Sequence, residues 1–335
     1  LWDSVPSKRL LDLTQKGKLD NPDQLHGIAN EMVWNWRTRS KMRGFFHHWL
    51  ELERADELSK DQDVFPQFND AVLGDLRTSL NLFLEEAVWG EGSGYRQLML
   101  ADYLFLNERL GKLYGKEVQG GFQKVSLDPK HRAGIVTHPF LLSSLAYHNN
   151  PSPIHRGVFL TRNIAGMSLK SPPMANEFKE GKFDPSLTMR EKVTEMTRAK
   201  ACMGCHVTIN PLGFSLENYD GIGRWRTKDR DKPINSKSDF KTGTGETIQL
   251  TGARDVAEFA VNAPSAHRTF LQQLFHHFVK QPVPAYGSSR MDELHKRFLD
   301  SGFYIPEMLK EISLVSALHK ENGNESAVSQ VATNP

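Results

Sequence analysis

The sequence predicts a mainly α-helical fold with little β-sheet. Apolar side chains recur with the 3.6-residue period of amphipathic helices over most of the 335 residues. Helix-start signals support this pattern, such as the Asn-Pro-Asp segment at residues 21–23, where proline stands near the first turn. Only residues 240–250, around Gly243 and Gly245, show the alternating residues and glycine turn of a β-hairpin. We therefore expect one small hairpin in an otherwise helical chain.

The first part of the chain, residues 1–115, is expected to form a helical bundle. Apolar and aromatic residues follow the helical period in four stretches, and Tyr114-Gly115 ends the last of them. The four stretches cover residues 21–36, 42–52, 69–89 and 95–113. This module carries no chemistry of its own, which favours a scaffold role.

The next part, residues 116–185, is expected to form a loop-rich connecting module with one short helix. Gly-Gly, Asp-Pro, His-Pro and Asn-Pro pairs interrupt its apolar runs. The helix is expected from Ile154 to Ile164, after the start signal Ser152-Pro153. Residues 166–186 are expected to be loop.

The last ordered module is expected at residues 186–320, followed by a disordered tail at residues 321–335. A charged helix at residues 188–201 opens this module, and the Asn-Pro-Leu-Gly segment at residues 210–213 is expected to be a turn. Four further helices are expected at residues 253–262, 265–280, 289–300 and 305–319.

The two cysteines of the chain stand in one pentapeptide, Cys202-Met203-Gly204-Cys205-His206. This is the C-x-x-C-H pattern of covalent c-type haem attachment. Two thiols three positions apart reach the two vinyl groups of one haem, and the histidine after the second thiol supplies an axial imidazole nitrogen to the iron. The pattern predicts one covalent haem c, held by Cys202 and Cys205 with His206 as axial ligand. The module at residues 186–320 is therefore expected to be a cytochrome c-like helical haem domain.

Other uses of the cysteine pair remain as alternatives. A closed zinc site needs four ligands, and the chain has no second cysteine pair. A dithiol pair of the thioredoxin type is expected at a strand-to-helix turn of a βαβ pattern, which the sequence lacks. A disulfide across two intervening residues closes a very small loop and stabilises little. Haem attachment is favoured because the five-residue pattern is the most specific of these signals.

The remaining iron ligands must come from nearby histidines or methionines. The second ring nitrogen of His206 is expected to donate to an acceptor, and residues 210–212 are the nearest source. For the sixth ligand the sequence offers Met174, His277 and His138, and a vacant position is a further alternative. Met174 is favoured because its Pro-Pro-Met loop resembles the stiff methionine loops of class I cytochromes c, although there the methionine follows the haem motif.

Arginines near the motif are candidate partners of the haem propionates. Arg224 and Arg226 flank Trp225, and a guanidinium group matches a carboxylate. Arg156 and Arg190 are further candidates of the same kind. Surface ion pairs are the more common use of such arginines.

Charge and composition exclude several classes of function. The 42 Lys and Arg against 40 Asp and Glu give a net charge of +2, too balanced to favour nucleic acid or an anionic membrane. Hydrophobic residues make up 39% and charged residues 24%, as in globular proteins. No apolar run approaches the ~20 residues of a membrane-spanning helix. No signal peptide is visible, and the chain begins Leu1-Trp2-Asp3, as expected for a processed or truncated piece.

Several longer stretches resemble one family of proteins. They are residues 101–108, 132–139, 152–158, 202–226 and 274–287. Together they resemble the planctomycete cytochrome-domain proteins, which are large secreted proteins assembled from modules of unknown function. The resemblance implies that this chain is the C-terminal portion of a longer protein. It supplies neither an activity nor a sixth ligand. Covalent haem attachment takes place on the periplasmic side in bacteria, which implies a periplasmic or otherwise extracytoplasmic location.

The predicted function is one-electron transfer within an extracytoplasmic redox or envelope assembly. Its partner is expected to be a redox protein or another module of the same longer chain. A haem enzyme of the peroxidase or oxidase type is one alternative, and it needs an open sixth position on the iron. An envelope module in which haem staples the fold is another. The sequence leaves open whether the chain is an enzyme, and the ligation state of the iron separates the carrier from the enzyme.

Overall fold

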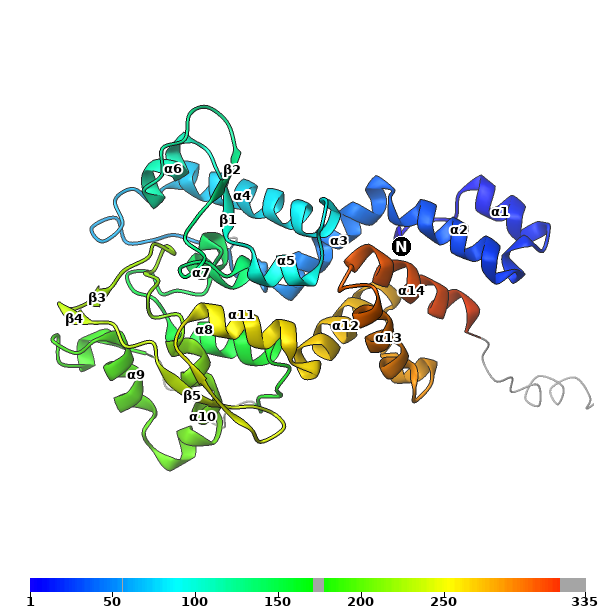
Figure 1. Ribbon diagram of the computed structural model, residues 1–335. Helices are drawn as coiled ribbons and strands as arrows, with labels where there is room; N and C mark the ends of the chain where they lie inside the picture. The colour runs from blue at the N-terminus through cyan, green and yellow to red at the C-terminus, as the bar shows by residue number, and fades with distance from the viewer. Residues whose placement is uncertain (56, 171–177, 320–335) are drawn as a thin grey trace, which may run out of the picture.

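The computed structural model describes residues 1–55, 57–170 and 178–319, and it is mainly α-helical, as predicted (Figure 1). The helices are α1 Lys8–Gln15, α2 Pro22–Val33, α3 Trp36–Trp49, α4 Asp70–Trp89, α5 Tyr95–Leu100, α6 Glu108–Tyr114, α7 Pro139–Ser144, α8 Pro153–Phe159, α9 Met189–Thr197, α10 Lys200–Phe214, α11 Ala253–Asn262, α12 Pro264–Val279, α13 Arg290–Asp300 and α14 Ile305–Leu318. The tail predicted at residues 321–335 lies outside the described residues. Among the described residues, no helix is both long and apolar enough to cross a membrane.

Three two-stranded antiparallel sheets accompany the helices in the described part of the chain. They are β1 Tyr103–Leu106 with β2 Gln123–Ser126, β3 Lys228–Asp229 with β4 Lys232–Pro233, and β5 Ser238–Lys241 with β6 Thr247–Leu250. The hairpin predicted at residues 240–250 is β5–β6, so that prediction is confirmed. The other two sheets were not predicted; β1 and β2 are connected through α6 rather than by a hairpin turn.

The fourth predicted helix, residues 95–113, is only partly correct. Helix α5 ends at Leu100, the apolar run Tyr103–Leu106 forms strand β1, and α6 follows from Glu108. A short apolar run fits a buried strand as well as a buried helix, so periodicity alone does not separate the two. The partner strand β2 lies about 20 residues downstream, and Tyr103 pairs with Ser126. The sequence pattern around residues 103–106 does not indicate this pairing.

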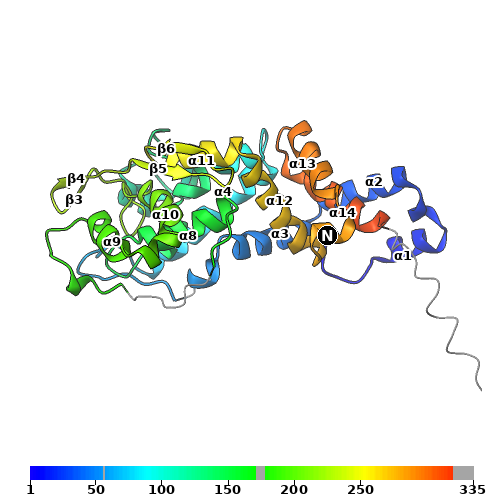
Figure 2. The same ribbon diagram turned by 90° about the horizontal axis from the view of Figure 1, so that it is seen from below.

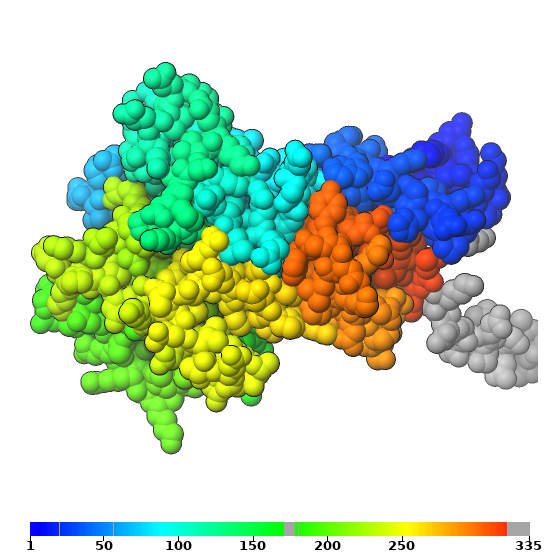
Figure 3. All heavy atoms as spheres, in the orientation of Figure 1, coloured from blue at the N-terminus to red at the C-terminus, as the bar shows by residue number. Residues whose placement is uncertain are grey.

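Most of the buried apolar residues that the structure describes form one large cluster, which runs from Val33 to Ile312. It includes residues of all three predicted modules, because the two ends of the chain pack together: α2 contacts α14 and α3 contacts α12. Figure 3 shows the C-terminal helices in contact with the N-terminal ones. Figures 1 and 2 both show an elongated molecule, with α1, α2 and α14 at one end and α9, β3 and β4 at the other. The module boundaries at residues 115 and 185 stay a prediction.

Helices α8 and α10 cross at close range, and this contact positions the cysteine motif. A glycine on each helix permits the approach: a Cβ at Gly157 would overlap the carbonyl oxygen of Ile209, and a Cβ at Gly213 would overlap that of Pro153. Ser152 begins α8 as predicted, since its side chain accepts a hydrogen bond from the amide of His155. The start of α8 is therefore fixed against the C-terminal half of α10.

The turn predicted at residues 210–213 is wrong, because these residues continue α10 to Phe214 with Pro211 inside the helix. Proline and the residue before it normally disfavour the helical conformation. Packing outweighs that preference here, since Ile209, Leu212 and Gly213 are all buried against neighbouring elements. The charged helix predicted at residues 188–201 is likewise split, with α9 ending at Thr197 and α10 beginning at Lys200.

Candidate haem site

The C-x-x-C-H motif occupies the first two turns of α10. Cys202 and Cys205 are both free thiols and both partly exposed. Residues three apart lie on the same face of a helix, so the two thiols point to one side. Met203 and Val207 from the same turns are exposed by 38% and 51%, although they are apolar. The N-terminal half of α10 therefore presents two thiols within an uncovered, partly apolar surface.

A chain of three hydrogen bonds connects the motif histidine to α9. The Nδ1 of His206 lies 2.8 Å from Oδ1 of Asn210, one turn later on α10. The side-chain amide of Asn210 donates to Oγ1 of Thr197 at 2.9 Å. The hydroxyl of Thr197 donates to the backbone carbonyl of Val193 at 2.8 Å. Asn210 and Thr197 are buried, so water does not compete for these bonds.

The direction of this chain fixes the tautomer of His206. The hydroxyl proton of Thr197 is used on a carbonyl, so its oxygen must accept from the nitrogen of the Asn210 side chain. The oxygen of Asn210 then faces Nδ1 of His206, and only a protonated Nδ1 can complete the bond. Nε2 is left as the lone-pair nitrogen, and it has no hydrogen-bond partner in the described part of the chain. The imidazole is thus held in the state that a metal ligand needs.

The expected acceptor for His206 was therefore found in the right segment but on a different group. The sequence pointed to residues 210–212, as backbone carbonyls of a turn. The structure uses the Asn210 side chain on a continuous helix. Thr197 was not predicted, because its role depends on the packing of α9 against α10 and leaves no sequence signal.

These residues fit covalent haem attachment. Two free thiols on one face, an axial nitrogen with its lone pair free, and exposed apolar side chains on the same turns are what the group requires. The haem would be held by Cys202 and Cys205, with His206 as axial ligand. It would also remove apolar surface of Met203 and Val207 from water, which is favourable.

A second, small apolar cluster lies beside the motif. Met189, Val193 and Phe214 form it, with the partly buried Ile154 and Phe178 packed against them. It joins α9 to the end of α10 and to the segment that follows residue 177. The ring of Phe178 also stacks on Tyr147, with centroids 4.9 Å apart. This cluster is separate from the large core, so the haem-motif region has little apolar packing of its own.

The three candidates for the sixth ligand lie in different places. Met174 is outside the described residues. His138 is fully buried: its Nδ1 accepts from the amide of Phe140 at the start of α7, and its Nε2 lies 3.5 Å from Oγ of Ser79. Burial, and to a lesser extent the charge of Arg132, lower the pKa of His138 to about 3. Ligation through His138 would require this part of the core to open.

His277 lies on α12, where its ring faces Phe45 of α3 with centroids 5.7 Å apart. Helix α12 packs on the π-helical turn Leu160–Ile164, and that turn packs on α10. Burial and the nearby Lys280 and Lys41 lower the pKa of His277 to about 4, so the ring is neutral at pH 7. No contact within the described residues brings His277 to His206.

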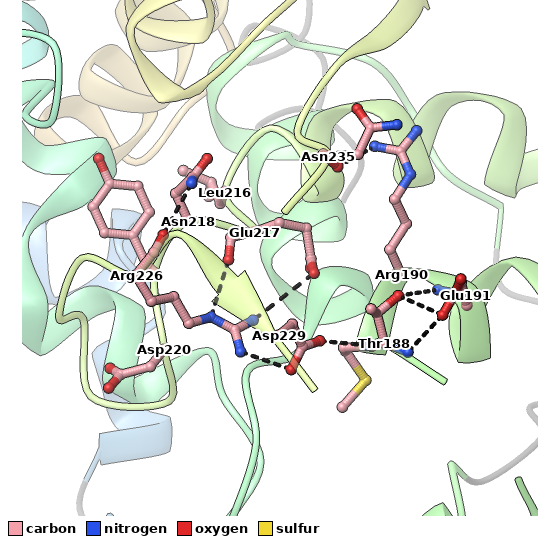
Figure 4. Close-up of polar contacts among 12 residues, drawn as sticks. Thr188, Arg190, Glu191, Leu216, Glu217, Asn218, Asp220, Arg226, Asp229 and Asn235 are labelled. Atoms are coloured by element: carbon pink, nitrogen blue, oxygen red, sulfur yellow. Dashed lines mark hydrogen bonds and ion pairs between the residues drawn. The ribbon is translucent and has the colours of Figure 1, made fainter. Parts of the chain in front are cut away.

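The predicted propionate partners Arg224 and Arg226 are engaged in ion pairs of the turn after α10, and Figure 4 shows those of Arg226. Arg226 donates from Nη1 to Asp229 at 3.0 Å and from Nε to the carbonyl of Glu217 at 3.2 Å. Arg224 donates from Nε to Asp220 at 2.7 Å. Binding to haem propionates stays a prediction for both arginines. It would replace their present carboxylate partners, Asp229 and Asp220, with the propionates.

The other two arginines bind backbone carbonyls. The guanidinium of Arg156 is fully buried and donates to four of them, those of residues 142, 216, 219 and 220. Arg190 donates to the carbonyls of Asn235 and Lys237. Arg156 thus ties the turn after α10 to α7, which fixes the C-terminal end of the motif helix.

Glu217 is a buried carboxyl group in the same turn that sequence reasoning missed. Its side chain is 2% exposed, its Oε1 has no hydrogen-bond partner in the described residues, and its Oε2 lies 3.9 Å from Nη2 of Arg226. Burial raises the pKa of Glu217 to about 7, against the opposing charges of Arg226 and Arg156. No sequence pattern marks a glutamate as buried, so packing alone reveals it.

Comparison with known proteins gives two family matches and no relative of known function. Residues 1–115 match the family described as PSD4, protein of unknown function (DUF1592). Residues 132–229 match PSCyt3, protein of unknown function (DUF1588), and this range contains the C-x-x-C-H motif. Both are planctomycete cytochrome-domain families, so the resemblance stated from the sequence is confirmed at that level. No curated protein and no solved structure matches the chain.

Proposed function

We propose that the chain is a c-type cytochrome module that carries single electrons within an extracytoplasmic assembly. The observation that carries the proposal is the hydrogen-bond chain from His206 through Asn210 to Thr197, which holds the imidazole with Nε2 free. A histidine on a surface helix has no structural need for a buried, two-residue support of this kind. An axial ligand does, because the bond from Nδ1 sets both ring orientation and basicity.

The chain's own residues supply the attachment and the electrostatic setting. Haem, when bound, supplies one-electron redox chemistry. Cys202 and Cys205 fix its position on α10, and His206 fixes the axial nitrogen. The partly exposed location of the thiols leaves an edge of the site near the surface, which suits electron exchange with a partner protein. The partner is a redox protein or another module of a longer chain.

Met174 is the proposed sixth ligand. The proposal rests on the Pro-Pro-Met sequence at residues 172–174, which resembles the methionine loops of class I cytochromes c. A methionine ligand gives a higher reduction potential than a histidine.

The test is absorption spectroscopy of the haem-loaded protein and of Met174→Ala. We expect a low-spin iron, with the weak far-red charge-transfer band of methionine-ligated ferric haem in the wild type and no such band in Met174→Ala. A low-spin spectrum without the band would transfer the role to a histidine such as His277 or His138, with a lower potential. A high-spin spectrum in the wild type would contradict the carrier function and support a peroxidase-like enzyme.

A further inference from the structure

A large cavity lies on a different part of the molecule, between α3, α12 and the segment that follows α8. Its volume is about 880 Å³, and residues from these three elements line it. The π-helical turn Leu160–Ile164 forms one wall and places Arg162 and Asn163 at the cavity. π-Helical turns are rare and occur frequently at functional sites. Neither the haem motif nor its hydrogen-bond partners line this cavity.

The charged side chains that line the cavity are all cationic. Arg162 and Lys280 are its two permanent charges, and neither has an ion-pair partner among the residues that the structure describes. No Asp or Glu belongs to the lining. Two acidic side chains lie near it. Glu51 is paired with Arg54 at 2.9 Å and accepts a hydrogen bond from Asn163. Asp3 interacts with Lys280 and His277, and its carboxylate is paired with Lys41 at 2.5 Å. The two free cations therefore leave a positive potential in the cavity.

The remaining lining combines an apolar base with hydrogen-bond donors. Phe45 and Trp49 are buried aromatic residues whose rings stack at 6.0 Å, and Met167 lies beside them. The amides of Gln272 and Gln273 supply further donors. The indole Nε1 of Trp49 is buried and has no acceptor in the described residues. A buried donor without an acceptor costs free energy.

We propose that this cavity binds a small organic anion with an aromatic or apolar body. Arg162 and Lys280 would bind the carboxylate, sulfonate or phosphate group, and Phe45, Trp49 and Met167 would contact the body. Cavities of this size with an apolar base and a few placed polar groups are typical of small-molecule sites. The proposal does not depend on haem attachment, because none of the lining residues belongs to the motif.

The test is a fluorescence titration with 1-anilinonaphthalene-8-sulfonate, an aromatic anion, beside N-phenyl-1-naphthylamine, its neutral analogue. We compare the wild type with Arg162→Gln/Lys280→Gln. The matched control is Lys8→Gln/Lys16→Gln, which removes the same charge from exposed positions at the two ends of α1. Loss of two charge-assisted contacts is expected to weaken the anion about tenfold or more. The control variant and the neutral analogue are expected to show no change.

Two results would overturn the proposal. One is an anion affinity that is the same in the wild type and in Arg162→Gln/Lys280→Gln, including no binding to either. The other is an equal loss for the anion and its neutral analogue, or an equal loss in the control variant. Circular dichroism and the unfolding midpoint establish that each variant is folded. If the double variant does not fold, the single variants Arg162→Gln and Lys280→Gln are each expected to weaken the anion about threefold or more.

Discussion

The hydrogen bond between His206 and Asn210 is predicted to set the reduction potential of the site. Asn210→Leu keeps the approximate size of the side chain but removes the acceptor for Nδ1–H, which lies 2.8 Å away. A hydrogen bond from Nδ1–H to an acceptor raises the basicity of an axial histidine and so favours the ferric state. Removing the acceptor is therefore expected to raise the potential of the one-electron couple.

The size of the shift follows from the strength of one such bond. A neutral hydrogen bond contributes about 1 kcal/mol. For a one-electron couple a tenfold change in equilibrium constant, about 1.4 kcal/mol, corresponds to about 59 mV. If most of that free energy acts on the ferric state, Asn210→Leu should raise the potential by about 40 mV. Asn210→Asp places a charged, stronger acceptor at the same point and should lower the potential.

Thr197 provides a second variant and a matched control. Thr197→Val leaves the amide of Asn210 without its acceptor and should raise the potential by less than Asn210→Leu does, because the direct bond to His206 remains. Thr194→Val removes an equivalent hydroxyl, which bonds the carbonyl of Arg190 at 2.8 Å on the same helix, without touching Asn210. It should leave the potential unchanged.

The assay is a spectroelectrochemical titration of each haem-loaded variant at one pH and salt concentration. We expect the reduction potential to shift in opposite directions in Asn210→Leu and Asn210→Asp. Shifts in the same direction, or no shift in either, would refute the role of Asn210. A shift in Thr194→Val as large as that in Thr197→Val would show that α9 responds nonspecifically to the loss of a hydroxyl.

Three further predictions concern the support of the motif helix, and denaturant unfolding measures each of them. Gly213→Ala forces a Cβ into the carbonyl of Pro153 and should destabilise the protein by about 1–3 kcal/mol, whereas Gly204→Ala, at an open position of the same helix, should not. Arg156→Met removes the side-chain donor of four carbonyls, of which those of Leu216 and Asp220 keep a backbone N–H partner, and should cost about 3–5 kcal/mol; a cost below about 1 kcal/mol would contradict that role. The raised pKa of Glu217, about 7 against the usual 4.5, means that the folded state binds the extra proton, so this group's stabilisation is present below pH 4.5 and is lost as the pH rises to 7. Glu217→Gln should therefore gain stability relative to the wild type by about 3 kcal/mol as the pH rises from 4.5 to 8, and a pH-independent difference would contradict the assignment.

The helices with clear periodicity and start signals could be predicted from the sequence. The last four predicted helices match α11 to α14 within one or two residues. Each has a regular apolar face, and all four begin beside a proline, glycine or serine. The strand β1 and the helical course of Pro211 could not be predicted, because tertiary contacts decide both: pairing with β2 in one case and packing on α8 in the other.

The candidate site shows the same division. The C-x-x-C-H motif names its residues because attachment chemistry requires that spacing. The support of His206 depends on Thr197, nine positions earlier on another helix, and no local pattern connects the two. The burial of Glu217 and Arg156 likewise depends on where α7, α8 and α10 meet. The sequence identifies the residues that would attach and ligate the haem. Tertiary packing identifies the residues that orient them and set the charge around them.

The most direct test of the central claim, one covalent haem on Cys202 and Cys205, is the intact mass of the denatured protein. The chain is expressed in a host that matures c-type cytochromes, beside Cys202→Ser/Cys205→Ser, and haem is stained on a denaturing gel. We expect the mass of the 38.0 kDa polypeptide plus one haem for the wild type, and that of the polypeptide alone for the variant. A wild type with the mass of the bare polypeptide would contradict it.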